Sequence, residues 1–243
     1  MQVEWHNARM FLFLKLVLAH MIADFILQFE ELYRLKLKSW TGHFLHALIH
    51  GMVSFLLLFP YLQDPFIWVF VAAITVIHYF QDQMKYSLQA KDPKNIFWYF
   101  TADQIFHVLF LASIFLFPAA HKPAGPYPVW NSFFQNSRAT LCLILFIGVS
   151  FKAAYFLHAL RKTFFKNTRP DHFITSFEMT WGLIERPWIA ICFLAGTPFA
   201  LALSPVPGLL RPLSPKTRGW LDFFLNYGYA ASAGWLFNHW IKL

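Results

Sequence analysis

Histidine, aspartate and glutamine recur at intervals of four residues in the first half of the chain. The stretch HMIADFILQ holds His20, Asp24 and Gln28, which fall on one stripe of a helix. Each of the next three apolar stretches contributes a similar pair: His46 with His50, His78 with Asp82, and Asp103 with His107. Imidazole and carboxylate groups without thiolates suit zinc, iron or manganese. The pattern therefore predicts a metal site shared by four helices.

The candidate ligands are more than one four-coordinate ion requires. They are His20, Asp24, His46, His50, His78, Asp82, Asp103 and His107. We predict either two ions, or one ion whose imidazoles are oriented by the remaining carboxylates. Zinc is the favoured metal, with iron and manganese as alternatives. Gln28 and Gln104 are predicted to hydrogen-bond a ligand or the substrate, and Lys85 to face an anionic headgroup.

The composition is that of a membrane protein. Hydrophobic residues make up 58% of the chain and charged residues only 13%, whereas about a quarter of a soluble domain is charged. The net charge of +8 is attributed to basic connections between spans rather than to nucleic-acid binding. Cys142 and Cys192 both fall in apolar stretches, so a disulfide framework is not supported.

Seven apolar stretches approach the roughly 20 residues that a membrane-spanning helix needs. They are residues 9–28, 43–62, 66–86, 96–118, 139–160, 187–203 and 220–240. The sixth stretch is short and contains Gly196-Thr197-Pro198, so it is predicted to be either a full span, a kinked helix or a re-entrant segment. The predicted fold is an all-α, polytopic membrane bundle. It divides into a four-helix front (1–118), a connection with prolines and glycine (119–137) and a three-helix rear (138–243).

Basic residues predict the orientation of the bundle. Lysine and arginine are concentrated in the connections after the first, third and fifth stretches, which places those connections in the cytoplasm. The N-terminus is then outside, the C-terminus is cytoplasmic, and the protein belongs to the inner membrane. All four polar pairs fall at the cytoplasmic leaflet, about one to two helical turns inside it. His43, which lies off the stripe of His46 and His50, is predicted to be interfacial.

The four motifs resemble a prokaryotic family of integral membrane proteins of unknown function. The family pattern runs H-x3-D-x3-Q, H-x3-H, H-x3-D-x2-K and D-Q-x2-H, and every motif position is filled within residues 10–118. The stretch GLIERP, from Gly182 to Pro187, is similar to a further stretch of longer members. By pattern the front half also looks similar to membrane-bound metal-dependent hydrolases.

The first predicted function is a metal-dependent hydrolase for a lipid or lipid-linked phosphate or amide at the cytoplasmic leaflet. Asp24 or Asp103 would take a proton from the metal-activated water. Glu185 and Arg186 are predicted to open the sixth helix, with Glu185 as a base or added ligand and Arg186 as a clamp for a phosphate or carboxylate.

The alternative is a metal-ion or proton transporter or relay, because membrane-buried histidine and aspartate also mark such pathways. The apolar ends of the second and fourth stretches argue against it. A haem-binding bundle is a third hypothesis, but haem needs imidazoles and no array of aspartates.

Overall fold

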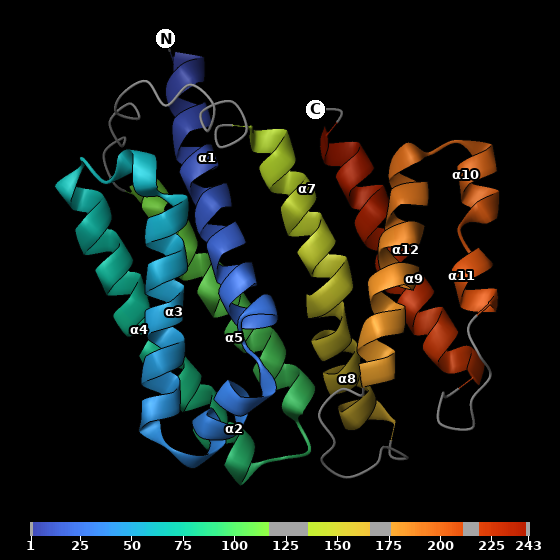
Figure 1. Ribbon diagram of the computed structural model, residues 1–243, viewed down its shortest axis with the longest axis horizontal. Coiled ribbons are helices and arrows are strands. Elements are labelled where there is room, and N and C mark those ends of the chain that lie inside the picture. Colours follow the sequence, from blue (N-terminus) through green and yellow to red (C-terminus); the bar gives the residue numbers. More distant parts are fainter. Residues whose placement is uncertain (1, 117–135, 166–175, 211–218, 242–243) are drawn as a thin grey trace. The chain divides into compact units, whose positions relative to one another are not determined.

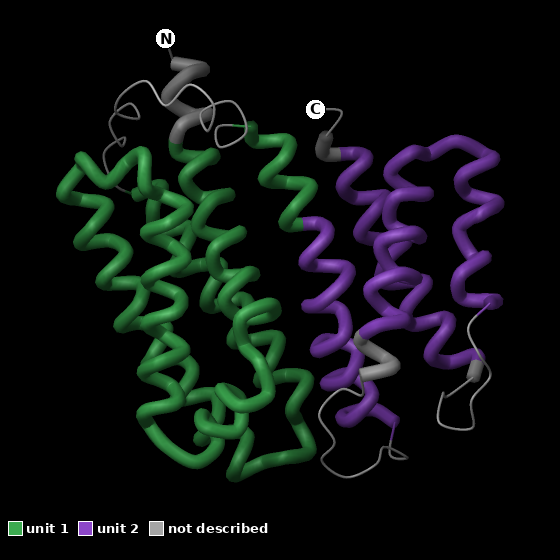
Figure 2. The backbone as a smooth tube through the Cα atoms, viewed as in Figure 1, with its two compact units in different colours: residues 1–144 green, residues 145–243 purple. Residues whose placement is uncertain are grey.

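The structure, a computed structural model, describes residues 2–116, 136–165, 176–210 and 219–241 (Figure 1). These residues are almost entirely helical and form no β-strand, which confirms the predicted all-α fold. The chain divides into two compact units, Met1–Ile144 and Leu145–Leu243 (Figure 2). The predicted connection 119–137 lies almost wholly outside the described residues, so the predicted domain limits stay predictions.

Unit 1 is a bundle built from the apolar stretches of the front half. Its elements are α1 (Gln2–Met21), the π-helical turn η1 (Ile22–Ile26), α2 (Glu30–Lys38), α3 (Trp40–Leu57), the 3-10 turn η2 (Phe59–Tyr61), α4 (Pro65–Lys91), α5 (Ile96–Ala112) and the 3-10 turn η3 (Ser113–Leu116); α7 (Ser137–Ile147) runs across the unit boundary. Helix α3 packs against α1 and α4, and α4 packs against α5. Asp64 caps α4 by accepting a hydrogen bond from the backbone N–H of Phe66.

A short helix, α2, occupies the connection after the first predicted span. It bends away from the preceding helix by 87° and packs against α3. Glu30 and Glu31 lie in its first turn, and Lys36 and Lys38 in its last, which complements the helix dipole. Leu32 and Lys36, one turn apart, are buried on the same face. From the sequence this segment was predicted only as a basic connection, without a helix.

On α4 and α5 of unit 1, most polar side chains of the motifs are buried and many apolar side chains are exposed. Exposed residues on α4 and α5 include Val69, Phe80, Ile105 and Leu109, whereas the histidines and aspartates of these helices that were predicted as ligands are buried. This inverted pattern is expected where lipid surrounds a bundle.

Within the described part of the chain, three helices are long and apolar enough to cross a membrane. They are Pro65–Lys91, Ile96–Leu116 and Ser137–Phe164. A fourth is added if the bent pair of α1 and α2 forms one span. The predicted total of seven spans and the predicted orientation of the termini stay predictions.

The part of unit 1 that does not carry the histidines is a packed apolar core. Leu12, Leu58, Ile67 and Val71 are almost completely buried there, and further leucine, isoleucine and aromatic side chains pack against them. In α1 and α4 this core precedes the histidines and aspartates of the motifs along the chain, and it also buries Lys15, whose Nζ lies 5.2 Å from the ring centroid of Phe11.

Unit 2 consists of η4 (Gly148–Lys152, a π-helical turn), α8 (Ala153–Phe164), α9 (Ser176–Ala195), α10 (Pro198–Leu203), α11 (Val206–Leu209) and α12 (Gly219–Ile241). Helices α9 and α12 pack closely: a Cβ at Gly234 would collide with the backbone of Ala190. Gly196 follows the end of α9 in the left-handed region, with a φ of 64°.

The structure differs from the predicted sixth span, 187–203. Helix α9 begins at Ser176 and ends at Ala195, and α10 is a separate short helix capped by Thr197. Proline is typical of the first turn of a helix, which is why Pro187 suggested a start. Pro187 instead lies inside α9, so the prediction that Glu185 and Arg186 open a helix is wrong.

Candidate metal centre

Five helical segments of unit 1 bring six of the predicted ligands to one place. These are His20 from α1, Asp24 from η1, His46 and His50 from α3, His78 from α4 and His107 from α5, and all are buried. Asp24 lies in a π-helical turn, a distortion that is frequent at functional sites. His50 and His107 lie about three turns from the starts of their helices.

The carboxylate of Asp24 is central to this cluster. Its Oδ1 lies 3.0 Å from Nε2 of His46 and 2.9 Å from Nε2 of His50, and 3.9 Å from Nε2 of His78. Its Oδ2 lies 3.4 Å from Nε2 of His20. One carboxylate therefore faces imidazoles from three helices.

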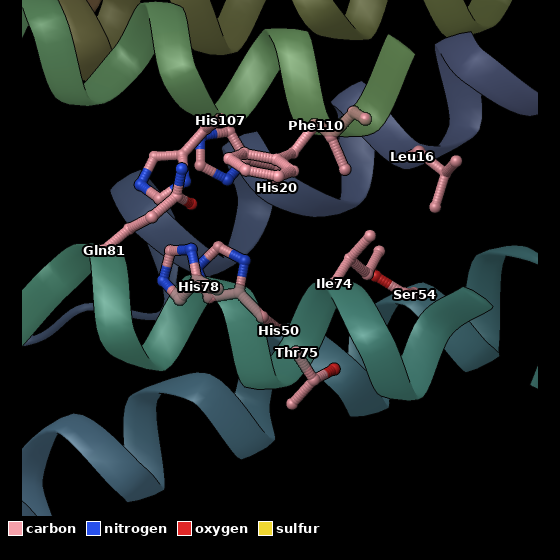
Figure 3. A pocket seen from close by; sticks show the side chains of 11 residues that line it. Leu16, His20, His50, Ser54, Ile74, Thr75, His78, Gln81, His107 and Phe110 are labelled. Carbon is pink, nitrogen blue, oxygen red and sulfur yellow. The ribbon is translucent and has the colours of Figure 1, made fainter. Parts of the chain in front are cut away.

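The imidazole rings of His20, His50, His78 and His107 face one another (Figure 3). Ring centroids are 3.7 Å apart for His50 and His78, and 4.4 Å apart for His78 and His107. Positively charged rings this close would repel each other strongly in a buried site. Imidazole binds a metal ion in its neutral form, and rings this close together can supply several ligand atoms to one ion.

A small pocket lies beside these rings. Apart from the four histidines it is lined by Leu16, Ser54, Ile74, Thr75, Gln81, Phe110 and Leu111 (Figure 3). Its cavity volume of ≈ 20 Å³ is enough for about one water molecule. A water at this position would meet imidazoles on one side and mostly apolar walls on the other.

Two overlapping groups of these side chains could hold a metal ion. One comprises Asp24, His46, His50 and His78, and the other His20, His78 and His107; within each group the ligand atoms lie within 4.8 Å of one another. The ligands of a tetrahedral zinc ion lie about 3.4 Å apart, and the contacts of Asp24, 2.9 to 3.9 Å, bracket that value. The buried Nε2 of His78 has no hydrogen-bond partner among the described residues. The residues thus fit a metal ion with small shifts.

Asp82 and Asp103, also predicted as ligands, belong to neither group found among the described residues. Asp82 is paired with Lys36 at 2.5 Å and with Lys85 at 3.3 Å. Asp103 is paired with Lys85 at 2.9 Å, and its Oδ1 lies 3.1 Å from Nε2 of His107. Both carboxylates border the centre, and each forms an ion pair with a lysine ammonium group. Spacing along a helix could not show this pairing.

Lys36 is the residue of this site that sequence reasoning missed. Its side chain is 1% exposed although it lies in a connection between predicted spans. The available signal was its position one turn after Leu32, which places a lysine on the apolar face of a short helix. Its Nζ also donates to Oε1 of Gln28 at 2.7 Å, so the predicted substrate-binding glutamine is tied to α2.

Two further polar residues, Gln104 and His43, lie near the centre. Nε2 of Gln104 donates to Oδ2 of Asp24 at 3.2 Å. His43 is buried, its Nδ1 lies 3.5 Å from Oδ2 of Asp82, and it belongs to neither metal-binding group found among the described residues; its position at the membrane interface stays a prediction. The ring of His43 packs against that of Tyr86, with centroids 5.2 Å apart.

Glu185 and Arg186 lie in unit 2, where both are buried. Arg186 donates through Nε to the carbonyl of Val149 and through Nη2 to that of Ser150, at 2.6 and 2.5 Å. Its Nη1 donates to Oδ1 of Asn226 at 2.9 Å. The guanidinium thus anchors the π-helical turn η4. The roles of Glu185 as base or ligand and of Arg186 as a clamp stay predictions.

The fold and the site define a class: a helical protein with membrane-length helices and a buried histidine and aspartate centre that could bind metal. Residues 12–132, which carry every residue of that centre, match a family described as "Protein of unknown function (DUF3307)". The chain belongs to this family through its front half, which confirms the resemblance seen in its motifs. No curated protein and no solved structure matches the chain.

Proposed function

We propose that this protein is a metal-dependent hydrolase of the inner membrane, acting on a lipid or lipid-linked substrate at the cytoplasmic leaflet. One observation carries the proposal: five imidazoles and one carboxylate from α1, η1, α3, α4 and α5 converge in buried groups that could hold a metal ion. Ionisable side chains inside a membrane bundle are costly to bury and usually serve a function.

The chain offers ligands for one or two ions, with zinc favoured because imidazoles dominate the set. Asp24, His46, His50 and His78 would hold a single ion. If a second ion binds, His78 joins His20 and His107 instead. Bound zinc would lower the pKa of a water toward neutrality and polarise the scissile group.

The residues around the ligands support proton transfer. Oδ1 of Asp103 lies 3.1 Å from Nε2 of His107, so this pair can receive and hold a proton at the edge of the centre. Lys85, 2.9 Å from Oδ2 of Asp103, fixes the carboxylate in place. Gln104 orients Asp24 through its Oδ2. We assign Asp103 as the proton acceptor, and Asp24 to the metal.

The surroundings support a substrate with an apolar tail. The pocket walls beside the imidazoles include Leu16, Ile74 and Phe110, and the outer faces of α4 and α5 are apolar. A substrate whose phosphate or amide reaches the histidines can therefore keep its tail in lipid. The small pocket has room for about one water molecule, and electrostatic interactions at a reacting group are stronger where little water is present.

The arrangement of unit 1 favours hydrolysis over transport. A transport pathway needs polar groups toward both membrane surfaces. In the described part of unit 1, the polar centre is followed by the packed core around Leu12, Leu58 and Ile67. A metal ion leaving the histidines in that direction would have to cross closely packed apolar side chains and pass the buried ammonium group of Lys15, which would repel it.

The test is a metal count on protein purified in mild detergent, combined with hydrolysis assays on lipid phosphates and lipid amides. We expect one or two zinc ions per chain, and loss of both metal and turnover in Asp24→Asn and His50→Ala. His239→Ala, at an exposed histidine of α12, is the matched control and should retain both. A wild-type protein without metal, or turnover that survives metal removal, would contradict the proposal.

A further inference from the structure

We propose that Lys36 determines which metal the centre selects, because it keeps Asp82 out of the ligand set. The inference rests on the proposed metal centre, but it concerns a lysine delivered by α2 and a carboxylate that belongs to neither metal-binding group. It adds a specificity-determining residue to the site.

Distance alone does not exclude Asp82 from the centre. Its Oδ2 lies 4.0 Å from Nε2 of His46, the nitrogen that is 3.0 Å from Oδ1 of Asp24. For comparison, Nε2 of His78, which does belong to the group, lies 3.9 Å from Oδ1 of Asp24. A small shift would therefore bring a second carboxylate to an ion held by Asp24 and His46.

The feature that separates Asp82 from Asp24 is its partner. Nζ of Lys36 lies 2.5 Å from Oδ2 of Asp82, which is the oxygen that faces His46. The side chains of this pair are only 1% and 2% exposed, and a buried carboxylate that loses its cation is strongly disfavoured unless another cation replaces it. Lys85 contacts the other oxygen, at 3.3 Å. Removing Lys36 thus takes the ammonium group from the oxygen nearest to the metal ligands and leaves it with the more distant Nδ1 of His43, at 3.5 Å.

The position of Lys36 is fixed by the packing of α2 on α3. A Cβ at Gly42 would collide with the backbone of Leu35 and Lys36, so only glycine permits this approach. Lys36 also lies 5.1 Å from the ring centroid of Tyr86 and donates to Gln28. These contacts direct the ammonium group at Asp82.

The consequence is a preference for zinc over manganese. With Asp82 held by Lys36, the ligand set consists of imidazoles and a single carboxylate, and imidazole suits zinc. A second carboxylate would favour manganese, which prefers oxygen ligands. Lys36 therefore sets the number of carboxylates available to the ion.

The experiment compares metal selection by the full-length protein in detergent. Wild type, Lys36→Met, Lys36→Arg and the double variant Lys36→Met with Asp82→Asn are stripped of metal and equilibrated with equal Zn²⁺ and Mn²⁺, and bound ions are counted by elemental analysis. Lys36→Met should raise the ratio of manganese to zinc by roughly tenfold, the scale on which residues bordering a metal act. Lys36→Arg keeps the positive charge and should keep the wild-type ratio. The double variant should return to that ratio, because its amide is uncharged.

A wild-type ratio of manganese to zinc in Lys36→Met would overturn the inference. A raised ratio in the double variant would also overturn it, because the altered selectivity would then not depend on the carboxylate of Asp82. Gly42→Ala gives a second route if Lys36→Met does not fold. It retains the lysine but displaces α2, so the ratio should rise, and an unchanged ratio counts against the inference. If wild type binds neither ion, the proposed function itself fails. A failure of the selectivity alone leaves wild type with its metal.

Discussion

The two units both bury charged or ionisable side chains, but they use them in different ways. In unit 2, the donors of Arg186 contact two carbonyls and an amide, and Arg161 pairs with Asp222 at 2.7 Å. In unit 1, imidazoles crowd around a single carboxylate, and Nε2 of His78 has no hydrogen-bond partner in the described structure.

The comparison teaches that burial of polar groups does not by itself mark a functional site. A guanidinium has only donors and cannot bind a metal ion, so the network of Arg186 holds backbone segments together. A neutral imidazole keeps a lone pair that can bind one. What distinguishes the centre of unit 1 among the described residues is that several imidazole nitrogens and a carboxylate oxygen lie close enough together to hold one ion.

The largest expected effect comes from metal removal. A ligand present at about a thousand times its dissociation constant stabilises a folded protein by about 4 kcal/mol. Chelation should therefore speed hydrogen exchange at the backbone amides of α3 and α4 and leave those of α9 and α12 unchanged, as measured by mass spectrometry. Equal acceleration in both units would break the comparison, and readdition of zinc, which should restore protection, is the control.

The next effect is expected from Arg186→Met. This change leaves the carbonyls of Val149 and Ser150 without a donor in a buried position, at a cost of roughly 3 kcal/mol in the free energy of unfolding. The metal content per folded chain should stay at the wild-type value. Unfolding curves in mixed detergent and elemental analysis measure the two quantities. Arg138→Met, at an exposed position, is the control, and loss of metal in Arg186→Met would show that the arginine network serves the centre.

The smallest effect compares two glycines of unit 2. A Cβ at Gly182 would collide with the guanidinium of Arg186, whereas a Cβ at Gly228 meets no atom within 4 Å. Gly182→Ala should lower the free energy of unfolding by about 1 kcal/mol, because the arginine must shift from its acceptors. Gly228→Ala should raise it by up to about 1 kcal/mol through helix propensity. Thermal unfolding of the two variants measures the difference in stability. Equal changes in the free energy of unfolding would show that contact with Arg186 does not explain the glycine of the GLIERP stretch.

Much of the fold could be predicted because its signals are local. Long apolar stretches predicted helices, and histidine and aspartate at intervals of four predicted which faces turn inward. The short helix α2 was missed because its nine residues are fewer than the window of about 11 to 18 residues over which helical periodicity is recognised. The start of α9 was placed too late because Pro187 resembles a first-turn proline, although the preceding residues also form helix.

The sequence by itself determined the helical class, the family and the set of imidazoles and carboxylates that could meet. It could not rank Asp24 against Asp82, because each has a histidine four residues before it on an apolar helix. Tertiary structure made the distinction by folding α2 back against α3, so that Lys36 reaches Asp82 while Asp24 faces His46 and His50. The partner of a buried carboxylate depends on contacts between distant segments, and no local spacing encodes that contact.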